Sequence, residues 1–258
     1  MPESRYEGYI FDLDGTIYLG DALIPGAALT IERLRSNERR MVFLSNKPLE
    51  GCANYAAKLT RLGIPACSDD VINSSQALIH LLRDRHPGAR VLAIAEHKLL
   101  DELAEAGFEV TQRVDIVDVV VAAFDRTLDY TKLNLAHQAL VRGAHFYATN
   151  GDKTCPVEGG EIPDCAGVIA FLEATTGRIV QEIAGKPSPH ILKAALARLQ
   201  ADASRCLMVG DRLDTDITMG VRAGMDTALV LSGVTSREML AETEIRPTYV
   251  LESVADCP

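Results

Sequence analysis

The sequence predicts an α/β protein whose main domain is a doubly wound parallel sheet, Rossmann-like in type, interrupted by an inserted α/β domain. Two observations predict this architecture. Short apolar runs with strand character alternate with helical stretches near both ends of the chain, and the central segment carries strand and helix signals of its own. With 258 residues, the chain is long enough for one large domain or two of ordinary size.

The outer segments carry the elements of the main sheet. Because each outer segment supplies only part of a sheet, we expect the two to form one discontinuous domain over residues 1–75 and 182–258. Pro189 stands at the start of an expected helix, a position that tolerates proline. The expected strands are 9–11, 41–44, 206–209 and 228–231, and the expected helices are 27–34, 51–62, 190–199 and 217–223.

The inserted domain is expected to span residues 76–181. Its apolar runs and helical periodicities are those of a second, smaller α/β unit. The interface between two such domains favours ligand binding. The expected strands are 91–95, 117–123 and 146–149, and the expected helices are 99–105 and 130–142.

Composition excludes several classes of protein. The formal net charge of -10 argues against non-specific binding of nucleic acid, which requires a basic surface. No apolar run approaches the roughly 18 residues of a membrane-spanning helix, and the N-terminus lacks the apolar core of a signal peptide, so we expect a cytoplasmic protein without a membrane partner. The six cysteines show no C-x-x-C pair, and we assign them neither a metal nor a disulfide framework.

Two carboxylates follow the first predicted strand, in the stretch Asp12-Leu13-Asp14-Gly15-Thr16. Side chains two residues apart on an extended chain share a face, and Gly15 lets the chain turn away, so both carboxylates can meet one substrate. The alternatives are a solvated turn and a calcium loop. A calcium loop would need an Asp or Asn at position 16 and an acid at position 23, where this chain has Thr16 and Leu23.

Three further strand ends or helix starts carry polar groups. Each has an ordinary explanation: a turn at Ser45-Asn46, a solvated surface charge at Lys186, and a helix N-cap at Asp214. Together they would crowd carboxylates at the edge of a parallel sheet where ligands bind, and a cation with a preference for oxygen ligands, such as Mg²⁺, relieves that repulsion. They are Ser45-Asn46, Lys186 in G-K-P-S-P, and the set Asp211, Asp214 and Asp216.

In this order the motifs D-L-D-G-T, L-S-N, G-K-P-S-P and G-D-R-L-D-T-D resemble the four motifs of the haloacid dehalogenase superfamily of aspartate-nucleophile phosphatases. The first and last are the specific ones. The spacing of the four motifs resembles that in the branch of 4-nitrophenyl phosphatase-like, phosphoglycolate and pyridoxal phosphate phosphatases. Members of this branch carry a large α/β cap between the second and third motifs. The resemblance covers essentially the whole chain.

The resemblance implies a role for each carboxylate. Asp12 would attack phosphorus to give an aspartyl-phosphate, and Asp14 would protonate the leaving oxygen and then help to activate water. Asp211 would bind Mg²⁺ together with the Asp12 carboxylate and the backbone carbonyl of Asp14, and Asp216 would support the metal site from the next helix.

The resemblance also implies the groups that bind phosphate. Ser45 and the backbone N–H of Asn46 would hold phosphoryl oxygens, while Lys186 would neutralise charge on the phosphate and Asp12. Relatives often carry Asn where this chain has Lys47. Two interpretations of Lys47 stay open, a contact to phosphate or to a substrate carboxylate, and a surface lysine.

Residues 149–156 resemble the loop by which family caps close over the substrate, although an ordinary Gly-containing loop is an alternative. The resemblance implies that Asp152, Lys153, Thr154 and Cys155 set substrate specificity. Because Thr154 and Cys155 are small and offer no aromatic surface, a compact sugar or polyol phosphate fits better than an aromatic one.

The leading hypothesis is therefore a magnesium-dependent phosphatase of small phosphorylated metabolites. Dehalogenation is disfavoured, since it needs neither a metal nor an acid at position 14. A phosphomutase and a non-catalytic sensor of phosphorylated metabolites stay open as alternatives. The resemblance further implies a homodimer formed through the cap.

Overall fold

The computed structural model describes residues 5–157 and 159–258. The contacts between Cα atoms divide the chain into two compact units. The first unit contains the described residues up to Ser45, with Cys52–Ile72 and Pro187–Pro258. The second contains Asn46–Gly51 and Asn73–Lys186, and each unit is described by itself.

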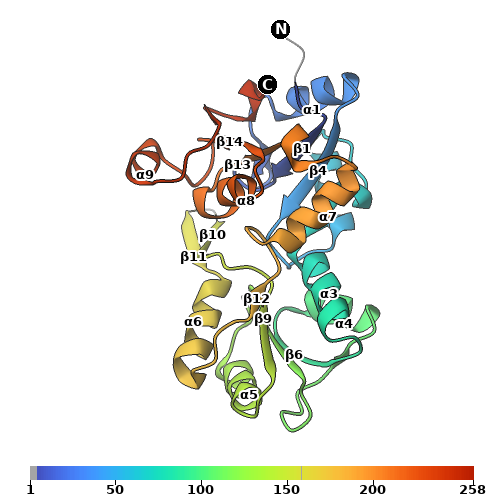
Figure 1. Ribbon diagram of the computed structural model, residues 1–258, viewed down its shortest axis with the longest axis vertical. Coiled ribbons are helices and arrows are strands. Elements are labelled where there is room, and N and C mark those ends of the chain that lie inside the picture. Colours follow the sequence, from blue (N-terminus) through green and yellow to red (C-terminus); the bar gives the residue numbers. More distant parts are fainter. Residues whose placement is uncertain (1–4, 158) are drawn as a thin grey trace. The chain divides into compact units, whose positions relative to one another are not determined.

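The first unit is built on a six-stranded sheet with the strand order β15-β14-β13-β1-β4-β5, of which Figure 1 labels β14, β13, β1 and β4. Strand β1 pairs in parallel with both β13 and β4, and β14 pairs in parallel with β13 and β15. The strand order reverses direction at β1, which is the topology of a doubly wound sheet, and the predicted fold class is confirmed. The strands are β1 (Gly8–Asp12), β4 (Arg40–Ser45), β5 (Val71–Asn73), β13 (Cys206–Gly210), β14 (Asp226–Val230) and β15 (Tyr249–Leu251).

The central strands of this sheet are buried on both faces, which explains their nearly continuous apolar runs. All five residues of β1 are buried. The Tyr9 ring stacks on Phe11 with ring centroids 5.9 Å apart, and Phe11 contacts Phe43 of β4 at 6.0 Å. This aromatic core anchors the strand that ends at Asp12.

Helices α7 and α8 pack on this sheet, α7 against β1 and β4 and α8 against β14. Pro189 begins α7, where the Ser188 hydroxyl accepts a hydrogen bond from the His190 N–H, as expected for a proline at this position. The helical elements are α1 (Ala27–Ser36), α2 (Cys52–Arg61), η1 (Ser68–Asp70), α7 (Pro189–Leu199), η2 (Ala203–Arg205), η3 (Leu213–Ile217), α8 (Thr218–Arg222), α9 (Arg237–Glu242) and η4 (Val254–Asp256), with a small hairpin of β2 (Tyr18–Leu19) and β3 (Ala22–Leu23).

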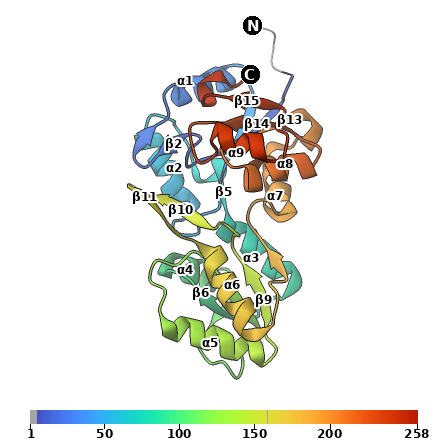
Figure 2. The same ribbon diagram turned by 90° about the vertical axis from the view of Figure 1, so that its left-hand side faces the viewer.

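The second unit contains a five-stranded sheet with the order β12-β9-β8-β6-β7, in which all neighbours are parallel. Helices α5 and α6 pack against each other and against this sheet, as Figure 2 shows. The elements are α3 (Ser74–Arg85), β6 (Arg90–Ile94), α4 (His97–Glu105), β7 (Glu109–Val110), β8 (Val119–Ala122), α5 (Tyr130–Val141), β9 (His145–Ala148), the antiparallel pair β10 (Thr154–Val157) and β11 (Gly160–Pro163), α6 (Cys165–Thr176) and β12 (Glu182–Ile183).

The chain crosses from one unit to the other a few residues away from the predicted crossings near 75 and 182. The chain passes between them after Ile72 and after Lys186, and the short segment Asn46–Gly51 belongs to the second unit. Within the second unit, the Asn46 side chain donates hydrogen bonds to the Asp152 carboxylate and the Lys186 carbonyl. The residue limits of the predicted domains stay a prediction. None of the described helices combines the length and the apolar character needed to cross a membrane.

Candidate active site

Three predicted site residues lie at the ends of neighbouring strands in the first unit. Asp12 is the last residue of β1, Ser45 is the last residue of β4, and Asp211 directly follows β13. Because β1 pairs in parallel with both other strands, their carboxyl ends lie at one edge of the sheet. This edge, at the point where the strand order reverses, is where open α/β sheets bind their ligands.

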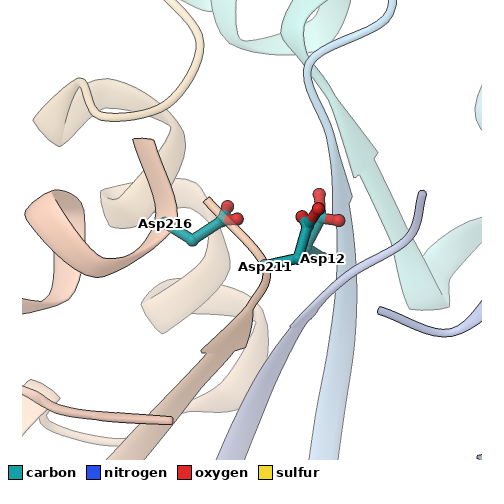
Figure 3. A group of neighbouring side chains, drawn as sticks. All are labelled: Asp12, Asp211 and Asp216. Atoms are coloured by element: carbon teal, nitrogen blue, oxygen red, sulfur yellow. The ribbon is translucent and has the colours of Figure 1, made fainter. Parts of the chain in front are cut away.

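The side chains of Asp12, Asp211 and Asp216 form a compact group of buried carboxylates. One oxygen from each lies within 4.8 Å of the other two. Their exposed fractions are 8%, 1% and 0%. Figure 3 shows the Asp216 carboxylate directed toward those of Asp12 and Asp211. The structure therefore brings together three of the residues that the sequence singled out.

Two glycines leave room for the Asp211 carboxylate. Gly15 has a positive φ of 85°, and a Cβ there would lie 2.5 Å from Asp211 Oδ2. A Cβ on Gly233 would overlap the same oxygen. The backbone N–H of Val234 donates a hydrogen bond of 2.6 Å to Asp211 Oδ2, so this carboxylate is held in one place by its surroundings.

Asp216 reaches the group from the π-helical turn η3, which precedes α8. The sequence predicted a helix from residue 217, and the structure instead begins the helical segment at Leu213 with a wider turn. The Arg212 N–H donates to Asp216 Oδ2 at 3.1 Å. A Cβ on Gly210 would overlap the Asp216 side chain, so that glycine is needed as well. Asp214, in the same turn, is exposed and lies outside the group.

Asp14 lies in the turn that follows β1 and is half-buried. The turn is closed by hydrogen bonds from the N–H of Gly15 to the Tyr18 carbonyl and from the N–H of Ile17 to the Leu13 carbonyl. Extension stops at Asp12, so the strand alternation that would place residues 12 and 14 on one face does not continue to Asp14. The part of Asp14 in metal binding, through its backbone carbonyl, stays a prediction.

The donor set fits a divalent cation. Three buried carboxylates within 4.8 Å repel one another strongly unless a cation lies among them. Carboxylate oxygens are hard ligands, which favour Mg²⁺ or Ca²⁺ over softer metals. Gly15, Gly210 and Gly233 leave the space that the carboxylates occupy, because a side chain at any of these positions would overlap Asp211 or Asp216.

Two predicted phosphate-binding residues, Asn46 and Lys186, lie together in the second unit. Both are buried. The Lys186 backbone N–H donates to Asn46 Oδ1 at 2.8 Å, and Asn46 Nδ2 donates to the Lys186 carbonyl at 3.2 Å. The Ser74 hydroxyl donates to the Asn46 carbonyl at 2.6 Å, so the Asn46 backbone is fixed too.

The predicted specificity residues differ in their surroundings. Lys153 is exposed, and Cys155 is buried. The Thr154 hydroxyl donates to Glu161 Oε2 at 2.6 Å across the β10–β11 hairpin. Asp152 is buried, and its Oδ2 accepts hydrogen bonds from the side chains of Asn46 and Asn150. This carboxylate thus has partners within the protein that the sequence did not indicate.

Sequence reasoning missed Asn150, Asp164 and Gly233. Asp164 precedes a helix, and this N-cap signal was available. Burial raises the pKa of the Asp164 carboxyl, while hydrogen bonds from the Asn150 side chain and the Cys165 N–H lower it. Gly233 had no signal, because it stands 22 residues beyond Asp211.

Comparison with known proteins identifies the family. The family described as haloacid dehalogenase-like hydrolase matches residues 9–109, and the HAD-hydrolase-like family matches residues 183–257. The chain is 36% identical over 245 residues to an acid sugar phosphatase of Staphylococcus epidermidis, covering 95% of this chain and 94% of that protein. It is 35% identical to the sugar-phosphatase AraL of Bacillus subtilis, and the match covers 96% of this chain and 91% of that protein. It is 37% identical to a D-glycerol 3-phosphate phosphatase of Mycobacterium tuberculosis, and the match covers 95% of this chain and 69% of that protein.

Solved structures give the same result. The crystal structure of a 4-nitrophenylphosphatase from Thermotoga maritima superposes with a TM-score of 0.92 at 33% identity, covering 97% of this chain and 95% of that one. A glycerol phosphate phosphatase from Mycobacterium tuberculosis, solved in complex with calcium, gives a TM-score of 0.88 at 35% identity, covering 97% and 74%. The chain therefore belongs to the haloacid dehalogenase-like hydrolase family, in its 4-nitrophenylphosphatase-like branch, and is a phosphoric monoester hydrolase.

Proposed function

We propose that this enzyme is a magnesium-dependent phosphatase that hydrolyses phosphate esters of small sugars or polyols through an aspartyl-phosphate. The group of three buried carboxylates, Asp12, Asp211 and Asp216, carries the proposal. One member lies at the end of the central strand, where the family motif has its nucleophile. Asp12 and Asp211 would give a divalent cation carboxylate oxygen ligands, and Asp216 would support them.

In the first step an Asp12 carboxylate oxygen attacks phosphorus, and the bond from phosphorus to the ester oxygen breaks. Asp14, entering the step protonated, gives its proton to the leaving oxygen. In the second step water attacks phosphorus while Asp14 takes its proton, and the bond between phosphorus and Asp12 breaks. Orthophosphate leaves, and both aspartates return to their starting states.

Asp12, Asp211 and the Asp14 carbonyl would hold the metal, with Asp216 supporting it. Bound Mg²⁺ supplies positive charge that lowers the repulsion between an anionic nucleophile and an anionic phosphate. Ser45, the Asn46 N–H and Lys186 would hold the phosphoryl oxygens. The burial of Ser45 and Lys186 supports this role, because a dry surrounding strengthens their interaction with charge.

The substrate class is supported by the names of the relatives, two of which act on sugar phosphates and one on D-glycerol 3-phosphate. The small residues Thr154 and Cys155 support the same class, because they leave no aromatic surface for stacking. A panel of sugar, polyol, nucleotide and pyridoxal phosphates measures this preference. Matched values of kcat/KM for pyridoxal phosphate and the small sugar phosphates would contradict it.

The mechanism is tested with Asp12→Asn, assayed with Mg²⁺ and with EDTA. We expect the substitution to abolish turnover, because an amide cannot act as the nucleophile, and EDTA to abolish turnover of the wild type. Asp214→Asn is the matched control, since Asp214 is an exposed carboxylate near the site and outside the buried group. Undiminished turnover by Asp12→Asn would refute the nucleophile.

The alternatives predict other results in the same assay. Transfer of the phosphoryl group to a second sugar in place of water would indicate a phosphomutase. Binding of phosphorylated sugars without any turnover would indicate a sensor. A cytoplasmic location and a homodimer formed through the cap stay predictions, the second measurable by sedimentation equilibrium.

A further inference from the structure

We propose that Asp152 is a positioning residue, which orients the Asn46 amide and thereby fixes the backbone of Lys186. The proposal rests on the proposed function, in which Asn46 and Lys186 bind the phosphoryl group. It changes the role expected for Asp152, from a residue that sets substrate specificity to a support of the phosphate-binding groups.

The contacts of the Asp152 carboxylate support this role. Its Oδ2 accepts hydrogen bonds from Asn46 Nδ2 at 2.9 Å and from Asn150 Nδ2 at 3.0 Å. The exposed fractions of Asp152, Asn46 and Asn150 are 8%, 9% and 1%. Hydrogen bonds between buried amides and a carboxylate are stronger than those between neutral groups.

The carboxylate selects one of the two orientations of the Asn46 amide. An ionised carboxylate only accepts hydrogen bonds, so the NH₂ group of Asn46 must face it. The amide oxygen then faces the Lys186 N–H, which donates to it at 2.8 Å. A flipped amide would place its oxygen against the carboxylate and its NH₂ group against the Lys186 N–H, and these hydrogen bonds would be lost.

The Asn46 amide holds Lys186 on both sides of its backbone. It accepts from the Lys186 N–H, and it donates to the Lys186 carbonyl at 3.2 Å. The approach is close, because a Cβ on Gly185 would lie 2.6 Å from Asn46 Oδ1 and 2.6 Å from the Thr149 carbonyl oxygen. The position from which the Lys186 side chain extends is therefore set by the amide that Asp152 orients.

Asp152 is itself held by the start of α6. Asn150 Nδ2 donates to Asp164 Oδ1 at 2.9 Å as well as to Asp152, and the Thr149 hydroxyl orients the Asn150 amide by donating to its oxygen. The Ala166 N–H donates to the Asp152 carbonyl at 3.0 Å. The loop that carries the predicted specificity residues is thus connected to the phosphate-binding backbone through buried hydrogen bonds.

The test measures binding of inorganic phosphate, which has no leaving group, by titration calorimetry in the presence of Mg²⁺. We expect Asp152→Ala to weaken phosphate binding roughly tenfold or more, and Asp152→Asn to weaken it less, about threefold, because an amide oxygen still accepts a hydrogen bond but carries no charge. With turnover, kcat/KM should fall by the same factor for every substrate. Asp101→Asn, an exposed carboxylate on α4, is the control and should bind phosphate as the wild type does.

A contact between Asp152 and the leaving group predicts the opposite pattern. Phosphate binding would be unchanged, and the loss in kcat/KM would vary among substrates; this result would overturn the proposal. A double-mutant cycle with Asn46→Ala adds a second measurement, since residues acting through one amide should give losses that do not add. If Asp152→Ala fails to fold, Asp152→Asn alone decides the question. Because phosphate binding needs no turnover, an inactive wild type would refute the proposed function without affecting this test.

Discussion

Gly15 illustrates how a single residue determines the geometry of the site. Its backbone has a φ of 85°, which L-residues with a side chain adopt only with strain, and it faces the Asp211 carboxylate. The Asp211 side chain is short and its Oδ2 is held by the Val234 N–H, so it has little freedom to move away from a new methyl group. Gly15 of the first motif thus leaves the space that the Asp211 carboxylate of the last motif occupies.

We therefore predict that Gly15→Ala weakens Mg²⁺ binding roughly 10- to 100-fold, the usual range for disturbing the surroundings of a metal ligand. Titration calorimetry and the Mg²⁺ dependence of turnover measure this loss. Gly20→Ala is a matched control, because Gly20 also has a positive φ, of 56°, and a Cβ there would meet nothing within 4 Å. Equal Mg²⁺ affinity in the two variants would contradict a role for the space beside Asp211 in metal binding.

At the scale of elements, the sequence predicted those strands that are buried on both faces. β1, β4 and β13 are short apolar runs, and their ends fixed the expected positions of Asp12, Ser45 and Asp211. The β10–β11 hairpin was missed, because β11 has no buried residue and hence no hydrophobic pattern. The partners of Asp152 were missed for another reason: Asn46 is 106 residues away, and only the folded chain brings the two together.

The starts of β6 and β8 are joined by an ion pair between Arg90 and Asp118. The Arg90 guanidinium donates to both carboxylate oxygens, at 2.8 and 2.7 Å, and the Arg90 backbone N–H donates a third hydrogen bond. These bonds lower the pKa of the Asp118 carboxyl to about 2. Both side chains are 38% exposed, so solvent reduces the stabilisation to about 1 kcal/mol at most.

We predict that Asp118→Asn lowers the free energy of unfolding by up to about 1 kcal/mol at pH 7. Because the folded-state pKa lies below the ordinary value, the contribution is complete above about pH 4 to 5 and disappears as the pH falls toward 2. Urea unfolding of both proteins at several pH values measures the difference. Asp115→Asn, which removes an exposed carboxylate paired with Arg113, should cost less. A difference that grows on acidification would contradict the assignment.

At the scale of the whole molecule, repulsion among the three buried carboxylates is a cost to folding that a bound cation would reduce. All three belong to the first unit, and their charges add to a chain that already has a formal net charge of -10. Asp216→Asn removes one of these charges and keeps a side-chain oxygen that can accept the Arg212 N–H. Stability and metal binding should therefore respond to this substitution in opposite directions.

We predict that in EDTA the melting temperature of Asp216→Asn exceeds that of the wild type, because repulsion within the group is reduced. Mg²⁺ at 100 times its Kd should stabilise the wild type by about 2.7 kcal/mol, roughly 5 to 10 °C for a chain of this size, and the variant by less. Scanning calorimetry measures both shifts, and Asp214→Asn should respond to Mg²⁺ as the wild type does. Where two transitions are resolved, the shift should occur in that of the first unit, since every carboxylate of the group lies there. A wild type whose melting temperature does not respond to Mg²⁺ would contradict the proposed metal site and with it the proposed role of Asp211.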